Sequence, residues 1–345
     1  MEVCERNRKV VSLRFGFFGL SLLLLVMSIA FFLGDTKITP AMFLQALVSN
    51  NNYDSDQLLA IMLRIRAPRI LLAAIAGGCL GMAGALMQSL LGNSLASPFT
   101  LGISSASAFG ASLAIVAGHS VISGEFAIIS NAFLFAMIAC LSVYALASLF
   151  GSSPILIILA GMGVNFLFSS LTTLLHYFAS PEAVYRAIFW TAGSLSNASW
   201  RVVSIESGVF CLSFVLLLPL LYDLSLVATG DQNAIVVGVD VRRVRLSGLI
   251  LASFLAASAV SFVGVIGFIG LVAPHLCRLI GVEDVRGLVP LSAITGGILL
   301  VLSDIAATRI AAPIILPIGA ITSLLGVVFL LALVILRGRR SWTRA

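Results

Sequence analysis

The chain has 345 residues, of which 60% are hydrophobic and only 10% are charged, and its formal net charge is +6. Soluble domains carry about a quarter charged residues, so a mean hydropathy of +1.14 excludes a soluble globular protein and indicates that lipid is the solvent for most of the surface. The positive charge does not indicate nucleic-acid binding, because basic residues at the ends of membrane helices explain it.

Ten apolar runs, separated by charged residues, glycine or proline, are candidates for membrane helices, which need roughly 20 residues to cross the hydrocarbon core. We therefore expect an all-α polytopic membrane protein with about ten transmembrane helices, folded as one transmembrane domain over residues 1–345. The runs fall at 15–33, 70–91, 100–118, 126–150, 154–177, 203–223, 245–264, 267–280, 287–309 and 319–336.

The first run follows a basic head, residues 1–14. Its apolar stretch of about 19 residues is longer than the core of a signal peptide, so we interpret it as a retained span. Basic residues favour the cytoplasmic side, which makes 1–14 a cytoplasmic tail. With ten alternating spans, 13 Lys and Arg residues fall inside and 7 outside, and both termini are predicted to be cytoplasmic.

Arginines gather on the predicted external face: Arg64, Arg66 and Arg69 precede the second span, and Arg309 ends the ninth. A guanidinium is a planar fork that binds carboxylates well, so Arg66, Arg69 and Arg309 are candidates for docking an acidic protein surface. The alternative is that these side chains reach lipid headgroups. We favour docking, because the positive-inside rule disfavours arginine on this face.

The fifth span carries polar side chains at steps of three and four residues, which places them on one helical face. They are Asn165, Ser169, Thr172, Thr173 and His176. A polar face on a membrane helix must meet protein or water, so it either joins helices through hydrogen bonds or lines a pathway. Both interpretations stay open, with Asn165, Ser169, Thr172 and His176 as the pathway candidates, and a lone histidine does not indicate a metal site.

The loop 224–245 is predicted to be cytoplasmic and to contain a short helix near 229–238, with Asp231 as its N-cap and Gly238 as its stop. Its apolar residues, Ala234, Ile235, Val236 and Val237, would project into water. An exposed apolar surface usually has a partner, so the loop predicts docking of a soluble cytoplasmic protein. The alternative is a helix lying flat at the membrane interface.

Two further features lie near the C-terminal half of the chain. Glycines and a proline interrupt the apolar segment 263–278, which predicts a broken helix whose freed backbone groups need a protein-lined or wet environment. Asp304 is the clearest acid within a span, and an ion pair with Arg309 in the same helix would accommodate it.

Chemistry-bearing motifs are missing from the sequence: it contains no nucleophile and base constellation, no HExxH metal motif and no Walker phosphate loop. The five cysteines have no paired spacing and resemble small core residues. We therefore expect no catalytic site, no metal site and no cofactor on this chain.

Several sequence blocks together resemble the permease subunits of iron-chelate and cobalamin ABC importers, the type II, FecCD-like family. The resemblance runs from about residue 35 to the C-terminus, and Gly-Phe-Ile-Gly-Leu followed by Pro-His-x-x-Arg is its most specific part. The blocks are Arg66-Ala-Pro-Arg69, Gly84-Ala-Leu-Met-Gln88, Gly92-Asn-Ser-Leu-Ala-Ser-Pro98, Leu101-Gly-Ile103, Trp190-Thr-Ala-Gly-Ser194, Gly230-Asp231 through Gly238-Val239, Gly267-Phe-Ile-Gly-Leu271, Pro274-His275, Arg278, Asp304 and Leu316-Pro-Ile-Gly319.

This resemblance implies a permease of the bacterial inner membrane that pairs with a second permease around a central pathway. Residues 229–239 would be the helix coupled to a cytoplasmic ATPase, which holds ATP and Mg²⁺, and the three docking arginines would receive a substrate-binding protein outside. The function implied is import of a ferric siderophore. Catecholate, hydroxamate, haem and cobalamin remain open as cargo, because the binding protein largely chooses the ligand in this family.

Three positions depart from the family pattern: Ser94 replaces a proline, Ile315 stands where an acid is common, and Gly326 begins a turn without its usual proline. These departures are similar to the second permease of catecholate-siderophore systems, which favours a heterodimer. The alternative function is an ion- or proton-driven secondary carrier, which also needs about ten spans and broken helices. That alternative predicts buried acids for ion coupling.

Overall fold

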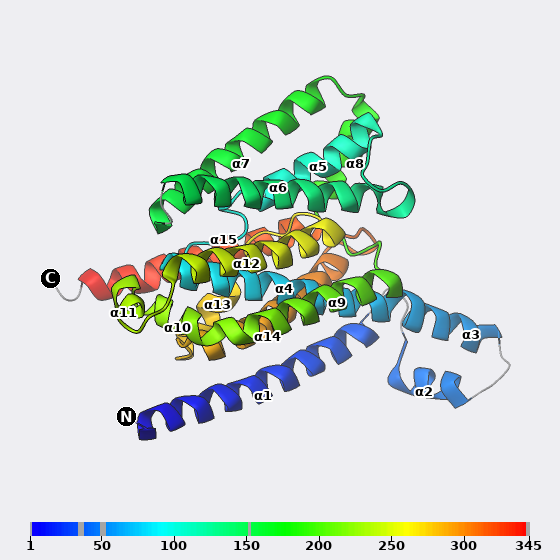
Figure 1. The fold of residues 1–345 in the computed structure, drawn as a ribbon. Coiled ribbons are helices and arrows are strands. Elements are labelled where there is room, and N and C mark those ends of the chain that lie inside the picture. The colour runs from blue at the N-terminus through cyan, green and yellow to red at the C-terminus, as the bar shows by residue number, and fades with distance from the viewer. Residues whose placement is uncertain (1, 34–37, 49–52, 151–152, 343–345) are drawn as a thin grey trace.

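The computed structural model describes residues 2–33, 38–48, 53–150 and 153–342, and within these ranges it is helical and without strands (Figure 1). Seven helices are long and apolar enough to cross a membrane, and three shorter apolar helices accompany them. The expectation of an all-α membrane protein with about ten membrane helices is confirmed. The predicted tail 1–14 is helical from Glu2 onward, as the beginning of α1.

The helices follow the chain in the order shown in Figure 1. They are α1 (Glu2–Phe32), α2 (Pro40–Val48), α3 (Tyr53–Ala60), the π-helix η1 (Ile61–Arg66), α4 (Ala67–Leu91), α5 (Ile103–Ala117), the 3-10 helix η2 (Gly124–Phe126), α6 (Ala127–Phe150), α7 (Pro154–Tyr177), α8 (Pro181–Thr191), α9 (Trp200–Leu217), the 3-10 helix η3 (Leu218–Leu220), α10 (Leu221–Ala228), α11 (Asp231–Val236), α12 (Val241–Val263), α13 (Ile269–Leu279), α14 (Val285–Arg309) and α15 (Ile318–Trp342).

Helix α4 forms the centre of the bundle. It packs against α14, α12, α13 and α9, and every residue from Ala76 to Leu91 is buried. Its glycines permit this close packing, because a Cβ on Gly77 would overlap the backbone of Gly296 on α14. Small residues at helix contacts let backbones approach closely, which is how membrane helices gain packing energy without a hydrophobic driving force.

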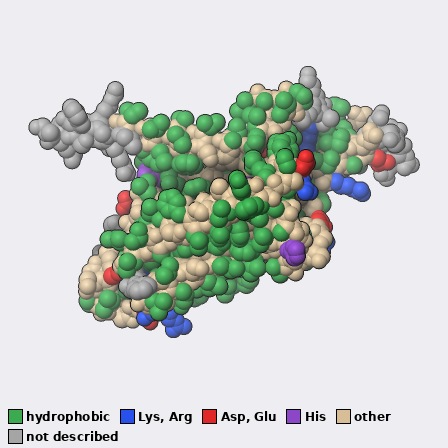
Figure 2. All heavy atoms as spheres, turned by 90° about the horizontal axis from the view of Figure 1, so that it is seen from above, with side chains coloured by type: hydrophobic (Ala, Val, Ile, Leu, Met, Phe, Trp, Pro, Cys, Tyr) green, Lys and Arg blue, Asp and Glu red, His purple; other side chains and the backbone are tan. Residues whose placement is uncertain are grey.

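A second group of helices, α5, α6 and α7, stands beside this centre and joins it mainly through the contact of α6 with α12 (Figure 1). Helix α1 covers the opposite side by packing against α14. Large exposed hydrophobic side chains lie along α1, α7, α9 and α15, and Figure 2 shows hydrophobic side chains spread over one face of the molecule. This apolar covering is what a lipid environment requires.

The break predicted in 263–278 is present. Helix α12 ends at Val263, Gly264 has a φ of 79°, and the chain resumes as α13 at Ile269. Pro274 does not take part in the break, which corrects the prediction, because it lies within α13. Proline removes one helical hydrogen bond, and the amide of Gln88 on α4 lies 3.5 Å from the freed Gly270 carbonyl.

The bundle has two distinct ends. Helix α1 begins, α15 ends and α11 lies at one end, whereas α2, α3 and α8 lie at the other (Figure 1). We call these the α11 end and the α8 end. The sequence predicts that the α11 end is cytoplasmic, and all candidate docking residues fall at one end or the other.

Candidate functional site

The predicted short helix is present as α11, a six-residue helix that protrudes at the α11 end (Figure 1). Three of its four predicted apolar residues, Ile235, Val236 and Val237, are exposed, and the Val236 side chain reaches 87% exposure. Ala234 is the exception and corrects the prediction, because it faces inward and is fully buried. The surface that α11 offers a partner is therefore made by Ile235, Val236 and Val237.

The two ends of α11 also differ in part from the expectation. Gly230, and not Asp231, occupies the N-cap, so Asp231 is the first helical residue. Its carboxylate is free to bind elsewhere, and it accepts a hydrogen bond of 2.6 Å from Arg245 of α12. Gly238 does end the helix as predicted, with a φ of 90° that glycine adopts easily.

At the α8 end, two of the predicted docking arginines contact other parts of the chain. Arg69 forms a bidentate ion pair with Asp304 of α14, at 2.8 Å between Nη2 and Oδ1 and 3.0 Å between Nε and Oδ2. Arg66 donates to the carbonyl of Phe31 at the end of α1, at 3.1 Å. The intrahelical pair expected between Asp304 and Arg309 is replaced by this contact with Arg69. A docking role for Arg66 and Arg69 stays a prediction.

Two other arginines at this end are exposed. Arg309 closes α14, and Arg64 lies in the π-helix η1. A π-helical turn widens a helix locally and often marks a functional position. Arg64 and Arg309 are therefore more exposed than Arg66 and Arg69, and a docking role for Arg309 also stays a prediction.

The polar face predicted on the fifth span lies on α7. Ser169 is exposed, Asn165, Thr172 and His176 are half-buried, and Val164 and Phe168 form the buried side of the helix. Thr172 donates to the Phe168 carbonyl at 2.8 Å, and His176 contacts the Ser112 hydroxyl of α5 at 3.1 Å. The contact of His176 joins α7 to α5, whereas that of Thr172 stays within α7, and Ser169 is exposed. A pathway-lining role for Asn165, Ser169, Thr172 and His176 stays a prediction.

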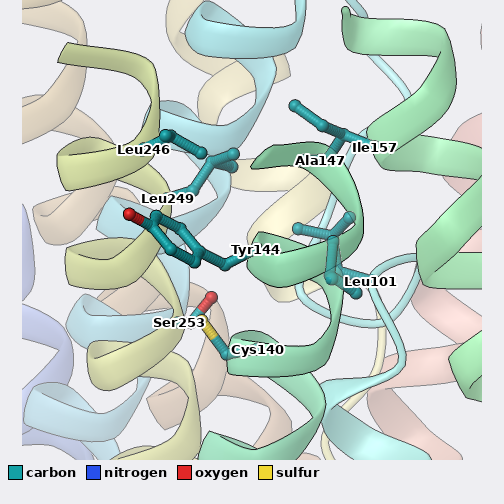
Figure 3. Close-up of a pocket in the computed structure, with 9 residues that line it drawn as sticks. Leu101, Cys140, Tyr144, Ala147, Ile157, Leu246, Leu249 and Ser253 are labelled. Atoms are coloured by element: carbon teal, nitrogen blue, oxygen red, sulfur yellow. The ribbon is translucent and has the colours of Figure 1, made fainter. Parts of the chain in front are cut away.

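A cavity of about 20 Å³ lies between α6, α7 and α12. Figure 3 shows its lining, in which Leu101, Ile157 and Leu249 supply apolar surface and Cys140 and Ser253 face each other. A volume of roughly 10–15 Å³ is the minimum for one water molecule. The cavity is therefore a packing gap and not a route for a chelate.

Among the acids whose burial the structure describes, the most deeply buried is one that sequence reasoning missed. Glu206 of α9 is fully buried, its Oε2 accepts a hydrogen bond from Ser258 of α12, and the thiol of Cys79 on α4 is a second partner of its carboxylate. Asp304, which the sequence singled out, is less completely buried. The sequence did contain an indication of this residue. Glu206 lies inside the predicted span 203–223, and an ionisable residue within a span is by default a candidate functional residue.

In the part of the chain that the structure describes, no cluster of three histidine, cysteine or acidic residues could hold a metal ion. The geometry defines a class: a polytopic helical membrane protein with an exposed apolar helix at one end and exposed arginines at the other. The chain belongs to the FecCD transport family, which its residues 22–336 match. It is an ABC importer permease, and this membership overrides the alternative of a secondary carrier.

Individual proteins support this assignment. The chain is 34% identical to the hemin transport system permease protein HmuU of Yersinia pestis, over 83% of this chain and 86% of that protein. It is also 34% identical to the iron(3+)-hydroxamate import system permease protein FhuG of Bacillus subtilis, over 88% and 91%. A solved structure described as an inward-facing metal-chelate type ABC transporter has a TM-score of 0.82 and 27% identity, covering 93% of this chain and 98% of that one.

Proposed function

We propose that this chain is the transmembrane permease of an ATP-driven importer that moves a ferric siderophore across the bacterial inner membrane into the cytoplasm. A partner ATPase, which holds ATP and Mg²⁺, docks on α11. A substrate-binding protein docks at the α8 end. The chain pairs with a second permease, and we favour a different permease over a second copy of this one.

The exposed apolar surface of α11 is the observation that carries this proposal. Ile235, Val236 and Val237 project from a short helix at the end of the bundle, while Ala234 anchors the helix to the core. Apolar side chains that are exposed in water favour a protein partner. A groove on an ATPase would cover them, and the small size of α11 suits such a groove.

The charge distribution supports a cytoplasmic position for this end. Arg242, Arg243 and Arg245 lie in the first turns of α12 directly after α11, and Arg278 and Arg286 lie where α13 ends and α14 begins. Cytoplasmic segments of membrane proteins carry an excess of Lys and Arg. This distribution favours an ATPase at the α11 end and a binding protein at the α8 end.

The cargo is supported by similarity and by three sequence positions. FhuG is named for iron(3+)-hydroxamate, a siderophore class, and HmuU is named for hemin. The departures at Ser94, Ile315 and Gly326 are similar to those of permeases for catecholate siderophores. These points favour a ferric siderophore, and haem is the competing cargo that the test must separate.

The test measures uptake in spheroplasts of a strain that lacks this chain and is complemented with it. The probes are ferric enterobactin, ferrichrome, hemin and cyanocobalamin, each offered with the substrate-binding proteins present. We expect the complemented strain to take up a ferric siderophore, to continue uptake when a proton uncoupler is added at constant ATP, and to stop uptake when ATP is depleted. Uptake of hemin or cyanocobalamin alone would refute the siderophore assignment, and uptake that stops with the uncoupler at constant ATP would refute ATP coupling.

A variant of α11 tests the docking surface in the same strain. Val236→Asp adds a charge to the most exposed apolar side chain, so we expect the ATPase to be lost when a tagged chain is purified, and uptake to fall to background. Val236→Ile keeps the surface apolar and serves as the control. Normal ATPase recovery and normal uptake with Val236→Asp would refute the assignment of α11.

A further inference from the structure

One guanidinium joins two helix ends at the α11 end of the bundle. Arg245 of α12 donates from Nη2 to the Asp231 carboxylate at 2.6 Å and from Nε to the Leu90 carbonyl at 3.1 Å. Asp231 begins α11, and Leu90 lies in the last turn of α4. The same side chain therefore touches the proposed docking helix and the central helix of the bundle.

Both contacts of Arg245 are charge-assisted hydrogen bonds, which are stronger than hydrogen bonds between neutral groups. The last carbonyls of a helix have no partner within the helix and carry partial negative charge, so a cation beside Leu90 stabilises the end of α4. The Arg245 side chain is only 5% exposed, whereas that of Asp231 is 44% exposed. Only an arginine offers separate N–H groups in a rigid fork that reaches both acceptors, and a lysine would supply one point charge.

Helix α4 extends from this contact to the opposite end of the molecule. Its 25 residues, at about 1.5 Å each, span roughly 37 Å. At its other end Arg69 forms the bidentate pair with Asp304 of α14. Between the two ion pairs the helix is buried and touches backbone at Gly77, Gly81 and Gly84, so it can shift only together with its neighbours.

We propose that Arg245 is a positioning residue for energy coupling: its pair with Asp231 transmits the movement of α11 to α4, and α4 carries it to the α8 end. This inference rests on the proposed function, because it assumes that an ATPase moves α11. The pair does not bind substrate or ATP. It determines how much transport results from each ATP hydrolysed.

The experiment uses the complete transporter that co-purifies with a tagged chain, reconstituted in liposomes with its binding protein. Three variants are compared with the wild type. Asp231→Asn removes the negative charge of the more exposed partner, and Arg245→Lys keeps the positive charge of the buried partner but removes its fork. The third is the double variant. Arg243→Lys is the matched control, because Arg243 is an exposed arginine in the same turn of α12. The readout is ATP hydrolysed per substrate imported, measured with ATPase recovery and thermal unfolding.

We expect both single variants to retain the ATPase and to raise the ATP used per substrate by about fivefold or more, the lower end of usual coupling between sites. The double variant should be no worse than either single one, because residues that act as a pair show non-additive effects. Arg243→Lys should match the wild type.

Several outcomes would overturn the inference. An unchanged ratio in both variants, or effects that simply add in the double variant, would show that the pair does not couple α11 to α4. Loss of the ATPase with Asp231→Asn alone would assign Asp231 to docking, and loss of the fold in both would make the pair structural. A wild-type complex without ATP-dependent import would refute the proposed function instead, which keeps the two failures distinct.

Discussion

Arginine side chains stabilise helix ends in this molecule in a recurring way. Arg245 donates to the Leu90 carbonyl at the end of α4, and Arg66 donates to the Phe31 carbonyl at the end of α1, each at 3.1 Å. In a chain with so few charges, each arginine that is taken from water must find acceptors, and the free carbonyls of a helix C-terminus supply them. Positive charge at these positions therefore supports the bundle as well as any partner.

The pair between Arg69 and Asp304 gives the first residue-scale prediction. Its side chains are 17% and 11% exposed, so removing one partner leaves a largely buried charge. We expect Asp304→Ala to destabilise the fold by on the order of 3 kcal/mol, as for other broken buried pairs. The measurement is thermal unfolding of the purified chain in detergent.

The pair between Glu125 and Arg201 provides the control. Its atoms are 3.5 Å apart and its side chains are 65% and 69% exposed, so Glu125→Ala should cost about 1 kcal/mol or less. If Asp304→Ala is no more destabilising than Glu125→Ala, Arg69 gains little from Asp304 and is available for docking a partner.

The partner of Asp304 also illustrates what the sequence can and cannot predict. An acid inside a span needs a cation, and Arg309 was the candidate in the same helix. Its spacing of five residues lies outside the steps of three and four that bring helical side chains together. The actual partner, Arg69, is separated by 235 residues and lies on a neighbouring helix, and such a contact depends on how helices pack. Glu206 and Ser258 are a second case, because their contact crosses from α9 to α12.

At the scale of elements, hydropathy predicted most membrane helices well, because each span must satisfy its own backbone in lipid. Prediction was weaker outside the lipid. Helical structure runs without interruption from Tyr53 through η1 to Leu91, whereas the predicted span began at residue 70. The polar residues of α3 carry no hydropathy signal. Within η1 the Leu63 carbonyl accepts a hydrogen bond from the indole of Trp200, a contact between distant segments that hydropathy does not reveal.

The close approach of α4 to its neighbours gives a prediction at this scale. A Cβ on Gly84 would overlap the backbone of Gly270 in α13, which no side-chain rearrangement can relieve. We expect Gly84→Ala to destabilise the fold by roughly 1–3 kcal/mol, the usual penalty for overpacking. Gly208 on α9 has open space around it, so Gly208→Ala should be neutral or stabilising by up to about 1 kcal/mol. Equal unfolding temperatures in detergent for the two variants would contradict the proposed packing of α4.

At the scale of the whole molecule, the shape indicates where cargo can pass. The cavity among α6, α7 and α12, at about 20 Å³, is far smaller than any iron chelate. Helix α7 packs mainly on α5 and α6, and beside this contact it carries the polar stripe of Asn165, Ser169, Thr172 and His176, of which Ser169 is exposed and the others are half-buried. A pathway that forms between this stripe and a second permease would explain why the chain has no large cavity of its own among α6, α7 and α12 and why α7 carries polar side chains. Each chain would then supply one wall of the pathway.

This placement is tested by adding bulk to α7. Ser169 lies on the exposed polar stripe, and Leu167, two residues earlier, is exposed on nearly the opposite side of the helix. Ser169→Trp should lower uptake of the ferric siderophore by about tenfold or more, a loss of about 1.4 kcal/mol or greater, while the ATPase still co-purifies and the unfolding temperature is unchanged. Leu167→Trp should leave uptake intact, because lipid accommodates an indole more easily than a narrow pathway does. Reduced uptake with Leu167→Trp and normal uptake with Ser169→Trp would place the pathway on the other side of α7 and assign the polar stripe to helix contacts.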